Sequence, residues 1–130
     1  DYNDKNLIVF FFPKADTSGC TSEAMAFSKL KKEFENQETI IIGISKDNPE
    51  KQKKFKEKHN LNCILGADHE TDICEQYGVW VEKSMYGRKY MGIQRTTFFI
   101  NKKGEIKFIW PKVKVNGHAE DVLKKVRELN

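Results

Sequence analysis

Two strand-length apolar runs separated by a helical pattern constrain the fold of this chain most strongly. Residues 7–12 read LIVFFF and residues 39–45 read TIIIGIS, a run rich in β-branched side chains, so both are typical of buried strands. The apolar residues between them recur at three- and four-residue spacing: Ala24, Phe27, Leu30 and Phe34. This period predicts one helix over residues 20–35. A strand, a helix and a strand in this order predict two parallel strands joined by a right-handed crossover.

The middle of the chain repeats this alternation. Asn48 is typical of a helix cap, and a helix is predicted over residues 49–59. A short strand is expected over residues 61–66. Asp68 then caps a brief helix that Gly78 ends.

The last third of the chain predicts a loop, a hairpin and a helix. Residues 79–94 show no clear period and are expected to form a loop. Residues 96–100 and 105–110 flank the turn sequence NKKG, which predicts a β-hairpin. Asn116 is expected to cap a final helix with these residues on its inner face: Ala119, Val122, Leu123, Val126 and Leu129.

This order of elements predicts an α/β fold. The early strands alternate with helices and are therefore parallel, whereas the closing hairpin adds antiparallel strands. The expected architecture is a three-layer sandwich, a mixed central sheet with flanking helices, and it resembles the thioredoxin fold. The 130 residues are expected to form one domain over 1–130.

Composition argues against several classes of function. The formal net charge is +4, and the lysine-rich segment 51–58 has no accompanying nucleic-acid motif, so it is interpreted as a solvated helix face. No apolar run approaches the roughly 20 residues of a membrane span, and neither a nucleic-acid nor a membrane partner is expected. Three cysteines form no even-numbered disulfide framework, which favours a reducing, cytoplasmic setting. The sequence starts at Asp1 rather than at methionine, so an upstream segment that targets an organelle stays open.

Cys20 stands at the start of the first expected helix, a few residues after a buried strand. It lies between the polar segments TSG and TSE. The first turn of a helix offers unpaired N–H groups and a partial positive charge, which favour the ionised, nucleophilic form of a cysteine. Sheets of this class also form their ligand crevices at the carboxyl ends of strands. We therefore interpret Cys20 as a reactive thiol rather than as a core residue.

Four ordered stretches resemble those of a known enzyme family. Pro13, Thr17 and Cys20 form PxxxTxxC, the signature of peroxiredoxins, which are thiol peroxidases with a thioredoxin-like core. The stretches FFPKADTSGCTSEA, DICEQYGVW and YMGIQRTTFFINKKGEI resemble segments of the bacterioferritin comigratory protein, or peroxiredoxin Q, subfamily. The resemblance covers essentially the whole chain, although the usual N-terminal strand that leads into this domain is missing.

The resemblance implies a role for each matching residue. Cys20 would be the peroxidatic cysteine, whose thiolate attacks hydrogen peroxide or an organic hydroperoxide and becomes a sulfenic acid. Thr17 would hydrogen-bond to the thiolate and the peroxide, and Pro13 would shield the sulfur from water. The N–H groups of Gly19 and Cys20 would bind a peroxide oxygen, under the guanidinium of Arg95.

Glu23 matches an acid that is common three residues after the cysteine in this family. We interpret it as orienting Arg95, although an acid in a first helical turn is also favourable without such a role. The resemblance implies no cofactor and no metal.

The chain departs from the family at the second, resolving cysteine. Many members place it five residues after the first, where this chain has Met25, and others place it on the following helix, which has none here. Cys63 and Cys74 are more simply core residues, although either can resolve if the first helix unwinds. The sequence therefore predicts a one-cysteine enzyme that an outside thiol reduces: glutathione, glutaredoxin or thioredoxin. A monomer is expected, with a dimer as the alternative.

Three other interpretations stay open from the sequence. A thioredoxin-type disulfide reductase needs two closely spaced cysteines, and Cys20 has no close partner. A metal site would have to be assembled from irregularly spaced residues: His59, Cys63, His69 and Cys74. A non-catalytic binding module would use the basic helix and the loop over 79–94.

Overall fold

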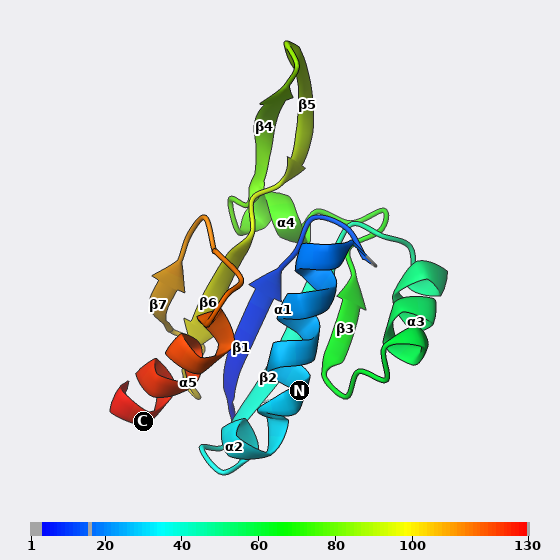
Figure 1. Ribbon diagram of the computed structural model, residues 1–130. Helices are drawn as coiled ribbons and strands as arrows, with labels where there is room; N and C mark the ends of the chain where they lie inside the picture. Colours follow the sequence, from blue (N-terminus) through cyan, green and yellow to red (C-terminus); the bar gives the residue numbers. More distant parts are fainter. Residues whose placement is uncertain (1–3, 16, 130) are drawn as a thin grey trace.

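A five-stranded mixed sheet, ordered β3-β2-β1-β6-β7, forms the centre of the molecule (Figure 1). The computed structural model describes residues 4–15 and 17–129. The strands of this sheet are β1 (Asn6–Phe11), β2 (Thr39–Ser45), β3 (Ile64–Ala67), β6 (Thr96–Ile100) and β7 (Ile106–Trp110). β1, β2 and β3 are parallel, whereas β6 and β7 run antiparallel to their neighbours. The predicted mixed sheet is confirmed.

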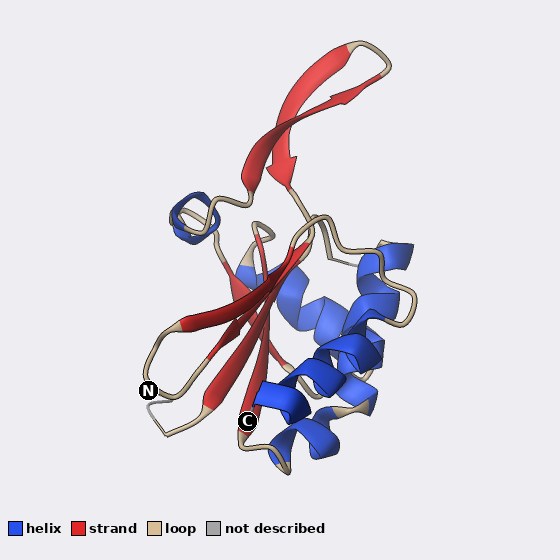
Figure 2. Ribbon diagram, turned by 90° about the vertical axis from the view of Figure 1, so that its left-hand side faces the viewer, coloured by secondary structure: helices blue, strands red, loops and turns tan. Residues whose placement is uncertain are grey.

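The described residues form five helices on the two faces of this sheet. They are α1 (Ser18–Lys29), α2 (Lys31–Glu35), α3 (Pro49–Lys58), α4 (Ile73–Gln76) and α5 (His118–Leu129). The short α4 lies on one face, and the other helices cover the opposite face (Figure 2). This arrangement gives the three layers that the sequence predicts. None of the described helices has the length and apolar character needed to cross a membrane.

Strand β1 supplies side chains to both cores because successive residues of a strand point to opposite faces. Phe10 faces the helical layer and stacks on Phe27 of α1, with ring centroids 4.7 Å apart. Val9 and Phe11 face the core beneath α4. Gly43 of β2 leaves room for the Phe10 ring, since an added Cβ would lie 2.5 Å from it. β1 is therefore held from both sides, which fixes the point where its carboxyl end leaves the sheet.

The first helix is shorter than predicted. α1 ends at Lys29 and α2 begins at Lys31, because Leu30 leaves helical geometry with ψ near 7°. Phe27 and Phe34, on either side of the break, still pack against each other with ring centroids 6.0 Å apart. The apolar period thus continues across the break, which is why the sequence pattern does not reveal it.

The last helix begins one residue later than an Asn116 cap implies. The carbonyl of Gly117 accepts the N–H of Asp121 at 3.1 Å, and α5 starts at His118. Leu129 is 49% exposed, so its assignment to the inner face is wrong. The other residues assigned to that face are buried: Ala119, Val122, Leu123 and Val126.

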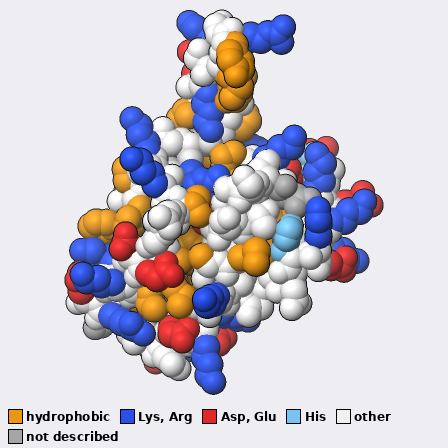
Figure 3. Space-filling model, in the orientation of Figure 1, with side chains coloured by type: hydrophobic (Ala, Val, Ile, Leu, Met, Phe, Trp, Pro, Cys, Tyr) orange, Lys and Arg blue, Asp and Glu red, His pale blue; other side chains and the backbone are white. Residues whose placement is uncertain are grey.

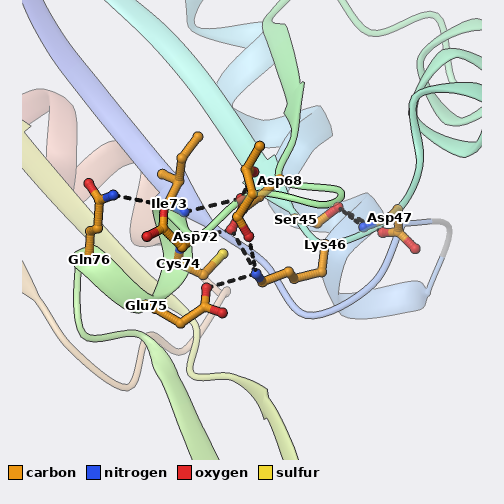
Figure 4. A network of polar contacts seen from close by, with 10 residues as sticks. Ser45, Lys46, Asp47, Asp68, Asp72, Ile73, Cys74, Glu75 and Gln76 are labelled. Carbon is orange, nitrogen blue, oxygen red and sulfur yellow. Dashed lines mark hydrogen bonds and ion pairs between the residues drawn. The ribbon is translucent and has the colours of Figure 1, made fainter.

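A network of polar contacts around Asp68 fixes α4 (Figure 4). Its carboxylate accepts the N–H groups of Ile73 at 3.1 Å and Cys74 at 2.7 Å, and Lys46 Nζ lies 3.2 Å away. Burial alone would raise the pKa of Asp68, but these N–H groups and the Thr71 hydroxyl hold it well below its usual range. Asp68 thus satisfies the first N–H groups of α4 as predicted, although the N-cap position itself is held by Asp72.

Residues 79–94 are mainly a β-hairpin, so the prediction of a loop is wrong. β4 (Trp80–Met85) and β5 (Arg88–Ile93) pair antiparallel in a separate two-stranded sheet that projects from the body (Figure 1). Tyr86 and Gly87 both have positive φ, at 53° and 78°, as the tight two-residue turn requires. Val79 and Ile93 are buried at the base, whereas the tip is exposed. We call this hairpin the arm.

Candidate active site

Cys20 lies in the first turn of α1, shortly beyond the carboxyl end of β1. Thr17 is the N-cap residue, and its carbonyl accepts the N–H of Thr21 at 2.8 Å. The N–H groups of Gly19 and Cys20 precede this bond, so the helix itself gives them no acceptor. They form the positive end of α1 near a thiol that is 1% exposed.

The guanidinium of Arg95 joins Cys20 to Glu23. Arg95 directly precedes β6, the antiparallel neighbour of β1. Its Nη2 lies 3.2 Å from Sγ of Cys20, and its Nη1 donates to Oε1 of Glu23 at 2.6 Å. A Cβ added at Gly19 would lie 3.3 Å from Nη2, so a glycine keeps this space open. The structure thus brings together four of the residues that the sequence singles out.

Glu23 is buried, and its carboxylate accepts a hydrogen bond from Arg95. Burial raises the pKa of Glu23 to about 7, and the adjacent guanidinium opposes that rise. Its Oε2 has no hydrogen-bond partner among the described residues. Burial tends to lower the pKa of Arg95, but Glu23 and Cys20 raise it above its ordinary value. This geometry supports the interpretation that Glu23 orients the guanidinium.

Thr17 and Pro13 lie on the loop before the helix. The hydroxyl of Thr17 donates to the carbonyl of Lys14 at 2.9 Å, and Pro13 is exposed. The hydroxyl proton is therefore directed to the loop backbone, while the hydroxyl oxygen keeps its capacity to accept. The contact of Thr17 with peroxide and the shielding by Pro13 stay predictions.

Asp47 ties this loop to the end of β2, a contact that the sequence reading missed. Its Oδ2 accepts the N–H of Ala15 at 2.6 Å and the hydroxyl of Ser45 at 2.7 Å. Ser45 in turn accepts Nε2 of the buried Gln52 at 3.0 Å. Figure 4 labels Ser45 and Asp47 beside the Asp68 network. We call Ser45, Asp47 and Gln52 the Asp47 clamp. The one sequence signal for it is a run of polar residues after β2.

Removing the Asp47 carboxylate is expected to slow the reaction of Cys20 with peroxide. Asp47→Ala leaves the Ala15 N–H without its acceptor and lets the loop shift. Because a displacement near 1 Å can reduce a catalytic rate by about 100-fold, we expect the rate with peroxide to fall by about 10- to 100-fold. Asp47→Asn keeps an accepting oxygen and should lose less. Stopped-flow rates measure both. Asp72→Ala, which removes an exposed acid bonded to Gln76, is the matched control, and equal rates in all variants would contradict the prediction.

His118 lies in the first turn of α5, as the sequence predicts, but its burial and its contact with Thr97 did not follow from the sequence. It is 5% exposed, and its Nε2 lies 2.8 Å from the hydroxyl of Thr97. Burial lowers the pKa of His118 to about 4, which Asp121 opposes and Arg95 reinforces. The ring is therefore neutral in the folded protein at neutral pH.

The stability of the fold should depend on pH through His118. Its pKa is lower in the folded chain, at about 4, than the ordinary 6.5, so its contribution is complete above pH 6.5 and is lost as the pH falls toward 4. Over that interval we expect wild type to lose about 3 kcal/mol relative to His118→Gln. Urea unfolding of both proteins at each pH measures this difference, and parallel pH profiles would contradict it. Groups common to both proteins cancel in the comparison.

Cys63 and Cys74 are buried on opposite faces of the sheet. Cys63 packs in the helix-side core and accepts a hydrogen bond from Ser28 at 3.5 Å, whereas Cys74 packs in the core beneath α4. Burial raises the pKa of both thiols, and the Asp68 carboxylate raises that of Cys74 further. Both are core residues, as the sequence favours, and all three cysteines are free.

The structure gives no support to a metal site built from His59, Cys63, His69 and Cys74. Cys63 and Cys74 lie in different cores, and His69 is exposed. In the ranges that the structure describes, no three His, Cys, Asp or Glu side chains are placed to hold one metal ion.

Comparison with known proteins identifies a protein family and named peroxiredoxins that this chain resembles. The AhpC/TSA family model matches residues 1–109. The putative peroxiredoxin bcp of Coxiella burnetii is 45% identical over 95% of this chain and 82% of its own length. Peroxiredoxin Bcp of Bacillus subtilis is 42% identical over 100% of this chain and 83% of its own length.

A solved structure of the Xanthomonas campestris bacterioferritin comigratory protein, studied for its alkyl peroxide reduction activity, matches with a TM-score of 0.93. It is 34% identical, and the match covers 98% of this chain and 81% of that one. This chain thus has a cysteine in the first turn of a helix, and Arg95 contacts both that cysteine and a buried acid. The same chain matches a named peroxiredoxin over its full length. The chain therefore belongs to the AhpC/TSA family and, within it, to the Bcp or peroxiredoxin Q group of peroxiredoxins, which are thiol-dependent peroxidases.

Proposed function

We propose that this protein reduces hydrogen peroxide and organic hydroperoxides through Cys20. The thiolate attacks one peroxide oxygen, the O–O bond breaks, and the departing oxygen takes a proton to become water or an alcohol. Cys20 is left as a sulfenic acid. The proposal rests mainly on one contact: Nη2 of Arg95 lies 3.2 Å from Sγ of Cys20. The same guanidinium donates a hydrogen bond to Glu23. The alkyl peroxide activity of the Xanthomonas relative supports the inclusion of organic hydroperoxides.

The departing oxygen gains negative charge as the O–O bond breaks. We assign its stabilisation to Arg95 and to the N–H groups of Gly19 and Cys20, since donors that are already in place act without reorganisation. The hydroxyl oxygen of Thr17 accepts a hydrogen bond from the peroxide, while its own O–H donates to the Lys14 carbonyl. Pro13 shields the Cys20 sulfur from water.

The oxidised enzyme is reduced by an outside thiol in a one-cysteine cycle. Support comes from the two other cysteines, because burial raises the pKa of both thiols and neither has a cation such as Arg95 in hydrogen-bond contact with its sulfur among the described residues. We propose a monomer as the working form. Three free cysteines support a reducing compartment such as the cytoplasm.

Peroxide-dependent turnover with each candidate reductant in parallel tests the proposal. Glutathione, glutaredoxin with glutathione, and thioredoxin with its reductase are supplied separately, and peroxide loss is followed. Peptide mapping after one equivalent of peroxide then tests the one-cysteine cycle. We expect a sulfenic acid at Cys20, trapped by dimedone, and no intramolecular crosslink. A disulfide from Cys20 to Cys63 or Cys74 would overturn the one-cysteine cycle.

A further inference from the structure

The side chain of Lys83 crosses the arm toward the candidate active site. Lys83 of β4 pairs with Tyr90 of β5, and Gly92 lies on the same face of the arm, two residues nearer to Arg95. A Cβ added at Gly92 would lie 3.3 Å from Cδ and 3.6 Å from Cε of Lys83. The lysine stem therefore leans across Gly92, in the direction of the strand end that leads to Arg95.

The arm projects from the end of the molecule at which α1 begins (Figure 1). Cys20 lies in the first turn of that helix, and Arg95 follows the arm after a single intervening residue, Gln94. Lysine and arginine side chains lie along the arm and beside its junction with the body (Figure 3). Lys83 thus belongs to the same end of the protein as the reactive thiol.

The charge of Lys83 stands in surroundings that disfavour it. The side chain is half-buried. Burial lowers the pKa of Lys83, and the guanidinium of Arg95 lowers it further, whereas Cys20 raises it. No carboxylate among the described residues forms an ion pair with Lys83, and Glu82 of the same strand points to the other face of the arm. Of the charged groups that act on this ammonium group, Cys20 is therefore the one that favours its positive charge.

We infer that Lys83 is a further residue of the peroxidase site, where it acts through its charge on Cys20. The inference rests on the proposed function, in which the Cys20 thiolate attacks peroxide. Because electrostatic attraction is mutual, a cation that the thiolate favours also favours the thiolate. Negative charge then passes from the sulfur to the departing oxygen, and a cation that is already in place stabilises it there as well. The arm thus adds a second positive charge behind Arg95, which contacts the sulfur directly.

Three variants separate the charge of Lys83 from its packing. Lys83→Met keeps an unbranched stem over Gly92 and removes the charge, and Lys83→Arg keeps a cation at this position. Lys89→Met is the matched control, since it removes the same charge from the arm on the opposite face: Lys89 pairs with Ser84, the next residue after Lys83. Lys89 is exposed, so its replacement leaves the packing of the arm unchanged.

The electrostatic potential at Cys20 is measured by alkylation of the reduced protein. Iodoacetate is an anion and iodoacetamide is neutral, so a cation near Cys20 accelerates the first reagent relative to the second. The ratio of the two rates cancels the thiolate fraction and the access to the sulfur, which both reagents share. Alkylated Cys20 is quantified in its peptide by mass spectrometry, at low ionic strength.

We expect Lys83→Met to lower the ratio of the iodoacetate rate to the iodoacetamide rate by about threefold or more. Lys83→Arg and Lys89→Met should keep this ratio within about 1.5-fold of wild type. Added salt should narrow the difference between wild type and Lys83→Met. Stopped-flow rates with hydrogen peroxide should fall by about three- to tenfold in Lys83→Met and by less than about twofold in the other two variants, with unchanged circular dichroism in all three.

An unchanged ratio in Lys83→Met would overturn the inference, because the charge of this residue would then not reach Cys20. An equal fall in Lys89→Met would also overturn it, since any charge on the arm would then suffice, and so would a failure of Lys83→Arg to keep the ratio. The proposed function fails separately, if peroxide forms no sulfenic acid at Cys20. The alkylation ratio is measured without peroxide and does not depend on that outcome.

Discussion

Peroxide consumption is expected to fall to the uncatalysed background in Cys20→Ser and to persist in Cys63→Ser and Cys74→Ser. A serine hydroxyl at position 20 is not ionised near neutral pH and so removes the nucleophile itself. Enzymes typically accelerate their reactions by about a millionfold or more, so the difference should span the range of the assay. Initial rates of hydrogen peroxide loss with dithiothreitol as reductant measure it.

The two control variants separate nucleophilic chemistry from a general loss of thiols. Each replaces a cysteine that is buried on one face of the sheet, so a modest loss of stability is expected for both. Rates are therefore compared at a temperature where circular dichroism shows each variant folded. Turnover that survives in Cys20→Ser would end the proposed function, because peroxide would then be consumed without the Cys20 sulfur.

Arg95→Ala is expected to lower the rate with peroxide by about 100- to 1000-fold, equivalent to about 3 to 4 kcal/mol. An ordinary cysteine is about 3% thiolate at pH 7, so complete ionisation of such a group gains only about 30-fold. A loss larger than about 30-fold would therefore show that the guanidinium acts on the departing oxygen as well as on the sulfur. Stopped-flow rates give the loss, and the pH dependence of alkylation at Cys20 gives the thiolate fraction in each protein.

Two further variants make the Arg95 result specific. Arg95→Lys keeps a cation but lacks the planar fork that contacts Glu23 and Cys20 together, so we expect it to recover only part of the rate. Arg95→Ala combined with Glu23→Gln avoids leaving an unpaired buried carboxylate and controls for folding. A rate that tracks the thiolate fraction alone across these variants would contradict a role at the oxygen.

Most of the main sheet followed from the sequence because each of its strands is a short apolar run. The arm did not, because its strands are paired with each other and not with the sheet. Side chains such as Tyr90 and Met91 are exposed, at 44% and 49%, and do not alternate between core and solvent. The two strands read WVEKSM and RKYMGI, and neither is an apolar run or a regular alternation that would predict a strand.

The candidate site was predictable where it depends on local sequence and on family resemblance. The place of Cys20 at a helix start follows from the turn before it, and Arg95 follows from the motif around it. The contacts of Asp47 and His118 did not follow from the sequence, for a different reason. Their partners, Ala15 and Thr97, are 32 and 21 residues away in the chain and meet them only through the tertiary packing of the sheet.

The arm joins the body at a narrow neck, where the Gln94 N–H donates to the Val79 carbonyl at 2.7 Å. Arg95 is the next residue of the chain. Within the arm, burial and the charge of Arg95 lower the pKa of Lys83, and Cys20 opposes that shift. Because Arg95 directly follows the arm, we expect a displacement at the base of the arm to shift the backbone that carries the guanidinium beside Cys20.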